Sequence, residues 1–570
     1  MAAVAMLAVS VGSASAATRA DADWSEAYFM AGDGVTQLHA DVLRPKGLPD
    51  SVKTPVVLTV SPYTNHSGQT PTDANPQASG PSTRFFDMLD VTGLLQKGYT
   101  YVMVDLPGDG GSAGCNDWGG AREQDGVRSA VEWAAAQPWS TGKVAMFGKS
   151  YDGWTGLMAM AQQPKGLAAV VSLEPVYSGY NYIYMNGVRR SSTTATVQEF
   201  QAGDAKPGTV NDTPQYNANG APEAWCYPLN IAGPAADDDE EGPYWKERNL
   251  IPTAFGKTTP LFLTQGFLET NTLPYGAFQY FNSLPGKENR AWFGQWDHCR
   301  PWETSQACNG SGASSGYGGA SSNALALGRQ GWADEIMRFL DLHLKGIQPT
   351  VQDPKIVVEE ATTGKFRSED AWPPKDSGLY TTDLNTGTYT DGAGSSAPSP
   401  SAGDGIWTVS APLDHTVWMS GEPVITAGVN SLPNANFSAD VYDIAPTGKA
   451  LLISRGVSLL RGLGDKTVSY TMYGQDWKLQ SQHRIGVLLT DTDTDTFTAV
   501  STNQSVTVRW ANIKLPFLSQ ARSGTIQGAM TPKDKGYLAA TFTFPSGVLP
   551  GAQKDFNLPG PLQDPQDNQN

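Results

Sequence analysis

The chain has 570 residues, which at about 150 residues per domain predicts roughly three or four structural units. Apolar residues make up 39% and aromatic residues 10% of the chain, and this composition excludes wholesale disorder. Acidic residues outnumber basic residues by 56 to 39, which gives a formal net charge of −17. Because this charge repels phosphate backbones, we expect no nucleic-acid partner.

The first residues have the pattern of a secretory signal. An apolar run from Ala2 to Val11 leads into the small residues Ala14, Ser15 and Ala16, which resemble a cleavage site. We therefore predict a signal peptide over residues 1–16 and a secreted protein, with an alanine-rich leader as the alternative. No later run approaches the ~18 apolar residues that span a bilayer, so we expect no membrane association.

Four cysteines in an exported chain predict two disulfides. Cys299 and Cys308 would close a short loop, and Cys115 would then pair with Cys226 by elimination. Cys299 also follows a histidine, which leaves a thiol nucleophile or a zinc site as an alternative. No C-x-x-C pair or His/Cys cluster supports that alternative.

Short apolar runs alternate with helical segments up to about residue 350. Strands are expected at 56–61, 101–105, 144–148, 167–173, 261–266 and 290–296, and helices at 123–137 and 331–346. Strands that alternate with helices predict βαβ units and a largely parallel sheet. We assign residues 25–176 and 251–350 to this α/β domain.

Two further regions differ from this pattern. Residues 177–250 are polar and rich in Gly, Asn and Pro, which predicts an inserted cap, with the acidic run 237–241 as a solvated loop. Residues 354–545 contain short β-rich runs separated by turn residues, which predicts an antiparallel β-sandwich or jelly roll. The tail, residues 546–570, is expected to be disordered or to lie across the surface.

A serine in a strand-to-helix turn is the strongest functional signal. Ser150 lies within Gly148–Gly153, between the predicted strand 144–148 and a helical segment. Such a turn exposes the serine hydroxyl at the carboxyl edge of the sheet. The strict G-x-S-x-G pattern would have glycine where Asp152 stands, so an ordinary turn serine remains the alternative.

A nucleophilic serine needs a histidine as its base. The six candidates are His39, His66, His298, His343, His415 and His483. In α/β-hydrolases the chain order is serine, acid, histidine. His298 is favoured, because it follows the serine and comes directly after the predicted strand 290–296. Glu269 is the first carboxylate after the strand 261–266 and is the preferred acid, with Asp297 as its rival.

Five segments of the chain have a recognisable pattern when taken together: Ser61–Tyr63, Asp105–Gly114, Arg122–Gly153, Gly266–Glu269 and Gln295–His298. They resemble the Xaa-Pro dipeptidyl-peptidase and cocaine-esterase family of serine hydrolases. The resemblance covers roughly residues 25 to 545. It implies an α/β-hydrolase core with an inserted cap, followed by an all-β jelly-roll domain.

The same resemblance implies roles for five residues. Ser150 would be the nucleophile, His298 the base and Glu269 the orienting acid, where the family usually has Asp. The Tyr63 hydroxyl and the Tyr151 backbone N–H would form the oxyanion hole. The implied chemistry is acyl transfer, for which no cofactor or metal is expected.

The substrate is the least determined part of the prediction. The leading hypothesis is an exopeptidase that releases Xaa-Pro dipeptides, and the alternative is an ester or amide hydrolase, so the partner is a peptide or a small acyl ester. A third reading is a carbohydrate- or surface-binding protein with an inert core, which a complete Ser/His/acid set disfavours. The acidic run Asp491–Asp495 lacks the Gly and Glu of an EF-hand, because Thr496 and Thr502 stand there, so we expect a polar hairpin.

Overall fold

The computed structural model describes residues 19–564 except 67–79, 194–210, 221–237, 305–324, 393, 395–398, 499 and 525. The predicted signal peptide, residues 1–16, lies outside the described residues. The chain divides into two compact units. The N-terminal unit comprises residues 1–144, 164–166 and 197–231, and the C-terminal unit comprises residues 145–163, 167–196 and 232–570.

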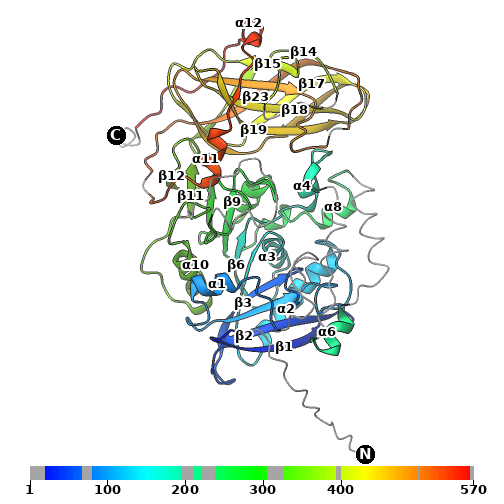
Figure 1. The fold of residues 1–570 in the computed structure, drawn as a ribbon, viewed down its shortest axis with the longest axis vertical. Coiled ribbons are helices and arrows are strands. Elements are labelled where there is room, and N and C mark those ends of the chain that lie inside the picture. Colours follow the sequence, from blue (N-terminus) through cyan, green and yellow to red (C-terminus); the bar gives the residue numbers. More distant parts are fainter. Residues whose placement is uncertain are drawn as a thin grey trace, which may run out of the picture. The chain divides into compact units, whose positions relative to one another are not determined.

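The N-terminal unit is built on a mixed sheet (Figure 1, blue). Its strands, in sheet order, are β1 (Ala22–Met30), β2 (Gln37–Pro45), β4 (Thr100–Asp105) and β3 (Thr54–Ser61). The pair β3 and β4 is parallel and fully buried, whereas β1, β2 and β4 pair antiparallel. Its helices are α1 (Phe86–Thr92), α2 (Ala121–Ala136) and α6 (Pro214–Asn219). The sequence analysis predicts β3, β4 and α2 but not β1 and β2.

The C-terminal unit contains the rest of the α/β structure. Its strands, in sheet order, are β5 (Ser140–Lys149), which begins in the N-terminal unit, β6 (Leu167–Leu173), β9 (Leu261–Gly266), β10 (Arg290–Gly294), β11 (Ile356–Glu360) and β12 (Lys365–Glu369). Strands β6, β9, β10 and β11 run parallel to one another, and β12 pairs antiparallel with β11. The helices are α3 (Tyr151–Gln162), α9 (Ala277–Asn282) and α10 (Trp332–Leu340), which continues as a π-helical turn η4 (Asp341–Lys345).

Strands β11 and β12 correct one predicted boundary. They fall within residues 354–545, which the sequence analysis assigns to the β-sandwich, yet they extend the sheet of the α/β region. Both strands contain β-prone residues, among them Val357, Val358 and Phe366, as the strands of the β-sandwich do, so composition alone does not separate the two sheets.

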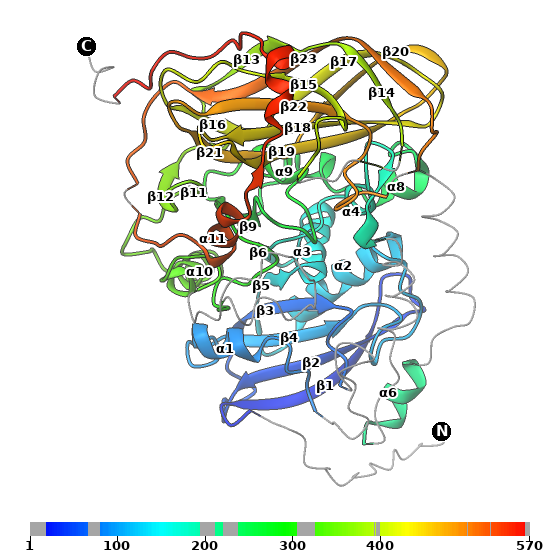
Figure 2. The ribbon, with the colours of Figure 1, turned by 45° about the horizontal axis from the view of Figure 1, so that its top comes forward.

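The β-rich region consists of two sheets that share one core (Figure 2, yellow to orange). The first sheet has the order β20 (Gly464–Thr471), β17 (Val424–Ser431), β23 (Ser505–Leu518), β16 (Val417–Gly421) and β21 (Gln475–Leu479), with β13 (Ser377–Asp383) and β14 (Gly387–Thr390) also on β23. The second has the order β15 (Gly405–Val409), β22 (Arg484–Thr490), β18 (Ala435–Ile444), β19 (Lys449–Leu460) and β24 (Phe542–Thr543). The predicted β-rich C-terminal region is therefore present.

The described parts of the predicted cap, residues 177–250, do not form a separate domain. Residues 211–220, with α6, belong to the N-terminal unit, and the other described parts belong to the C-terminal unit. The latter contain α4 (Gly179–Ile183), β7 (Tyr184–Met185), β8 (Val188–Arg189), η1 (Ser191–Thr193) and α8 (Pro243–Glu247), and η3 (Pro252–Ala254) follows just after them. Met185 and Val188 pack against Val457 and Phe497 of the β-rich region, which anchors this segment.

The last described residues lie along the β-rich region. They follow α11 (Pro532–Ala539) and include η5 (Ser546–Val548) and α12 (Leu549–Ala552). Ala552 is buried, and the Lys554 N–H donates to the Val409 carbonyl. Among the described helices, none is long and apolar enough to cross a membrane.

The predicted disulfides can be compared with the structure at two of the four cysteines. Cys115 and Cys299 are each disulfide-bonded, whereas Cys226 and Cys308, their predicted partners, lie outside the described residues.

In the acidic run 491–495, Asp495 forms an ion pair with Arg455 at 2.6 Å. The Arg455 charge offsets part of the acidic charge of this run.

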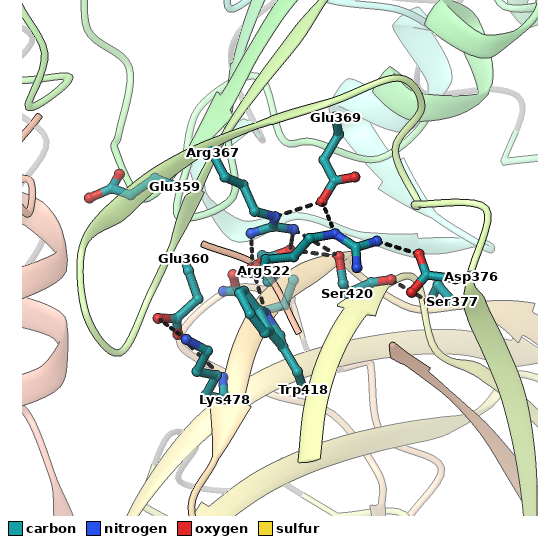
Figure 3. Close-up of polar contacts among 12 residues, drawn as sticks. Glu359, Glu360, Arg367, Glu369, Asp376, Ser377, Trp418, Ser420, Lys478 and Arg522 are labelled. Carbon is teal, nitrogen blue, oxygen red and sulfur yellow. Dashed lines mark hydrogen bonds and ion pairs between the residues drawn. The ribbon is translucent and has the colours of Figure 1, made fainter. Parts of the chain in front are cut away.

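A buried ion-pair network joins β12 to the β-rich region (Figure 3). The Arg367 guanidinium donates to both carboxylate oxygens of Asp476, at 2.8 and 2.6 Å, and to Glu369 at 2.7 Å. Arg522 in turn bonds Glu369 and Asp376. The remaining donors to Asp476 are Trp418 and Ser420 of β16. The bidentate pair fixes the orientation of β12 against β21.

Removal of this arginine is expected to destabilise the C-terminal unit. Arg367→Met leaves the Asp476 carboxylate buried without its main counter-charge, which costs about 3–5 kcal/mol in the free energy of unfolding. Denaturant unfolding followed by circular dichroism measures this loss. Arg509→Met, which removes an exposed pair with Asp465, is the matched control and is expected to change the unfolding midpoint little. Equal midpoints for the two variants would contradict a structural role for the network.

Candidate active site

Ser150 occupies a strained turn between β5 and α3. Its backbone has φ 66° and ψ −124°, a conformation that is rarely adopted by residues with a side chain. Gly148 permits the turn, because a Cβ at that position would lie 2.3 Å from the Asp152 carbonyl oxygen. Ser150 is partly exposed, whereas Tyr151 and Asp152 are buried. The turn therefore presents the serine at the end of the strand, as the sequence analysis expects.

Backbone hydrogen bonds link the carboxyl ends of the strands around Ser150. The Ser150 N–H donates to the Leu173 carbonyl at the end of β6, at 2.8 Å. The Glu174 N–H donates to Thr264 of β9 at 3.0 Å, and the Phe267 N–H donates to Gly294 of β10 at 2.6 Å. Because Glu269 and His298 follow β9 and β10 directly, the segments that carry all three predicted residues lie at the same sheet edge.

Glu269 and His298 are in direct contact. The Nδ1 atom of His298 lies 2.9 Å from Oε2 of Glu269, and both residues are more than 90% buried. The other carboxylate oxygen, Oε1, accepts the backbone N–H groups of Asn271 and Thr272, at 2.6 and 3.2 Å. The carboxylate is therefore fixed by its own loop, and a proton on Nδ1 leaves Nε2 of His298 as the basic nitrogen.

Asp297, the rival acid, has different partners. Its carboxylate bonds Lys533 at 2.6 Å and also the backbone N–H and hydroxyl of Thr270. Although burial alone would raise the pKa of Asp297, the Lys533 charge and these hydrogen bonds hold it below its usual value. Its contact with His298 is to the backbone N–H and not to the ring. The geometry thus favours Glu269 as the partner of the imidazole.

A buried carboxyl group that the sequence analysis misses lies between these loops. Glu174 follows β6 and accepts hydrogen bonds from Thr264, Gly266 and Trp296, at 3.2, 2.9 and 2.7 Å. Burial, together with the nearby Glu269 charge, raises the pKa of Glu174 well above its usual value. Glu174 thereby connects the ends of β6, β9 and β10. Its position directly after a predicted strand was the available signal.

The segment after β23 supports the histidine loop from another side. Glu359 of β11 accepts the backbone N–H groups of Gln295 and Thr531, at 2.8 and 3.0 Å. The Thr531 hydroxyl also donates to the Gln295 carbonyl. Burial raises the pKa of Glu359 to about 8. Residues 531–533, which are far from His298 in sequence, therefore help to position its loop.

The two predicted oxyanion donors belong to different units. Tyr63 lies just beyond β3 in the N-terminal unit, where the Arg84 guanidinium lies 4.2 Å from its ring centre. Tyr151 is the first residue of α3 in the C-terminal unit, so its backbone N–H lies at the positive end of that helix.

The backbone strain at Ser150 can be measured. Ser150→Gly removes the steric cost of the positive φ, whereas Ser150→Ala keeps a Cβ and hence the strain. Both variants lose the hydroxyl. After allowance for the greater flexibility of glycine in the unfolded chain, we expect the glycine variant to be more stable by about 1 kcal/mol. Denaturant midpoints of the two proteins test this, and a more stable alanine variant would contradict the strained turn.

Comparisons with known proteins agree with the sequence resemblance. Residues 33–300 match the family model described as X-Pro dipeptidyl-peptidase (S15 family). A Streptomyces avermitilis protein assigned as an Xaa-Pro dipeptidyl-peptidase is 24% identical over 438 residues, which cover 72% of this chain and 58% of that protein. A Mycobacterium bovis protein assigned as a serine esterase is 21% identical over 526 residues, covering 76% of this chain and 80% of that protein.

A solved structure supports the fold. An α-amino acid ester hydrolase superposes with a TM-score of 0.63 at 16% sequence identity, covering 89% of this chain and 98% of the other. The likeness extends over both the α/β and the β-rich regions. The resemblance inferred from sequence is thereby confirmed: residues 33–300 match the model of the X-Pro dipeptidyl-peptidase (S15) family, and the chain is similar to proteins assigned as Xaa-Pro dipeptidyl-peptidases and serine esterases.

Proposed function

We propose that the protein removes Xaa-Pro dipeptides from the N-termini of peptides through an acyl-enzyme on Ser150. The observation that carries this proposal is the family match over residues 33–300, a range that contains Ser150, Glu269 and His298. The hydrogen bond between His298 and Glu269 supports it further. The chain spans 58% of the length of the Streptomyces relative, so the peptidase activity of that protein is a proposal here.

In the proposed reaction, His298 Nε2 takes the proton of the Ser150 hydroxyl as its oxygen attacks the prolyl carbonyl carbon. Glu269 accepts the hydrogen bond from Nδ1 and stabilises the imidazolium that forms. The imidazolium then gives its proton to the leaving amine, and the peptide bond breaks. Water, deprotonated by His298, releases the dipeptide from the serine ester.

The negative oxygen of the tetrahedral intermediate needs hydrogen-bond donors. We propose the Tyr63 hydroxyl and the Tyr151 backbone N–H for this role. One such donor typically contributes about 100- to 1,000-fold to the rate. The position of Tyr151 at the start of α3 supports its part, because the helix dipole favours negative charge there.

Hydrolysis of a carboxylic ester or amide is the second candidate function. The specific observation for it is the alignment with the Mycobacterium bovis protein assigned as a serine esterase, which spans 526 residues. An ester reacts through the same acyl-enzyme and has a better leaving group. The two candidates differ in one requirement, since a dipeptidyl-peptidase must bind the free ammonium group of its substrate.

Paired substrates separate the two functions. We expect cleavage of Gly-Pro and Ala-Pro p-nitroanilides with a free amino group and loss of cleavage after N-acetylation, because the acetyl group removes the positive charge. The readout is kcat/KM, measured beside p-nitrophenyl acyl esters. Ester turnover with no cleavage of either free-amine anilide would replace the peptidase by the esterase. Ser150→Ala provides the background rate.

Substitution of the two carboxylates identifies the acid. Glu269→Gln is expected to lower kcat/KM by about 1,000- to 10,000-fold, because the amide no longer stabilises the imidazolium. Asp297→Asn, the matched control, keeps the His298–Glu269 bond and is expected to stay within about 10-fold of the unmodified enzyme. Circular dichroism verifies that both variants are folded. The reverse order of the two effects would assign the acid to Asp297.

A further inference from the structure

Two buried histidines of the N-terminal unit have no part in the proposed reaction. His39 lies on β2 and His66 follows β3, and they are 1% and 6% exposed. Their rings meet edge to face, with centroids 5.3 Å apart. Glu26, on the neighbouring strand β1, completes a group whose potential ligand atoms all lie within 4.8 Å of one another.

Each imidazole is held by a carboxylate at Nδ1. His39 Nδ1 lies 2.9 Å from Asp105, and His66 Nδ1 lies 2.8 Å from Asp212. Asp105 is itself fixed by the Thr64 hydroxyl at 2.6 Å. A histidine that binds a metal commonly donates its other ring N–H to a carboxylate in this way, which sets the tautomer and the ring orientation. Both histidines thus have the outer support of a metal ligand.

The Nε2 atoms face further carboxylates at longer distances. His39 Nε2 lies 3.3 Å from Glu26, and His66 Nε2 lies 3.1 Å from Asp41. Charge-assisted hydrogen bonds are usually about 2.7–2.9 Å long, and the Nδ1 contacts meet that range. Ligand atoms around tetrahedral zinc, with bonds of about 2.0–2.1 Å, lie about 3.3 Å apart. The Nε2 contacts, at 3.3 and 3.1 Å, are on average closer to the spacing of two zinc ligands than to the length of a charge-assisted hydrogen bond.

The cluster contains more carboxylates than imidazoles. Four carboxylates surround the two imidazoles: Glu26, Asp41, Asp105 and Asp212. Within the described part of the chain, the charged partners of Glu26, Asp41 and Asp105 are these two histidines. A divalent ion bound to neutral imidazoles supplies the same two positive charges as two protonated imidazoles, and places them at one point between the ligands.

We propose that Glu26, His39 and His66 bind a structural zinc ion, with an oxygen of Asp41 as the fourth ligand. Imidazole nitrogens favour zinc over calcium or magnesium, which prefer oxygen ligands alone. Asp105 and Asp212 act through the histidines and orient them. The Glu26 side chain is 21% exposed, which gives the ion a route to the site. The ion would join β1, β2 and the segment after β3, and so stabilise the N-terminal unit.

Metal content and thermal stability test this proposal with the tag-free full-length protein. The protein is stripped with EDTA, dialysed against Zn²⁺ and freed of unbound metal. Mass spectrometry of the metal is expected to give about one zinc per chain. The melting temperature is expected to rise by a few degrees with Zn²⁺ and to stay constant with Ca²⁺, because ligand that binds the folded state stabilises it.

Matched variants separate the loss of zinc binding from a general loss of folded structure. Glu26→Gln keeps the size of a half-buried side chain and is expected to lose zinc and the zinc-dependent rise in melting temperature. His39→Gln is expected to do the same. His483→Gln is the control, because His483 also contacts a carboxylate, Asp443, at 2.7 Å but lies in the C-terminal unit. It is expected to bind zinc as the unmodified chain does.

Two results of these zinc measurements would overturn the proposal. Far less than one zinc per chain in the unmodified protein would overturn the proposal. Equal zinc uptake by Glu26→Gln and by the unmodified protein would also overturn it. Should His39→Gln fail to fold, Glu26→Gln still decides, since its ligand oxygen lies at the edge of the cluster.

Discussion

The hydrogen bond between His298 and Glu269 is the interaction on which the candidate site depends. It joins the loops that follow two neighbouring parallel strands, β9 and β10, and it fixes the direction of the imidazole. The family resemblance implies an aspartate at this position, which is one methylene shorter than glutamate. The longer glutamate is accommodated because its second oxygen folds back onto the N–H groups of Asn271 and Thr272. The extra methylene is thus absorbed within the loop.

The support for this pair comes from buried carboxyl groups on both sides. Glu174, which follows β6, accepts hydrogen bonds from Gly266 of β9 and from Trp296 after β10. Glu359 accepts the backbone N–H groups of Gln295 and Thr531. Burial raises the pKa of both groups. Each carboxyl group accepts hydrogen bonds from more than one of the surrounding segments and so serves as a bridge between them.

The sequence predicts the central strands well because they are buried on both faces and form continuous apolar runs. It misses β1, whose alternately half-exposed residues resemble a loop, and it assigns β11 and β12 to the wrong sheet. Ser150, Glu269 and His298 were accessible to prediction because each directly follows a predicted strand. Glu26, His39 and His66 are brought together only by strand pairing. Chain order set both histidines aside as bases, and their spacing matches no short metal motif.

The contact between Lys533 and Asp297 links residues 236 positions apart in the chain. During synthesis, the histidine loop leaves the ribosome long before the lysine that neutralises its aspartate. Thr531, which bonds the same loop, is also made late. A nascent chain with a completed α/β sheet therefore still lacks the contacts that the segment after β23 makes with the histidine loop.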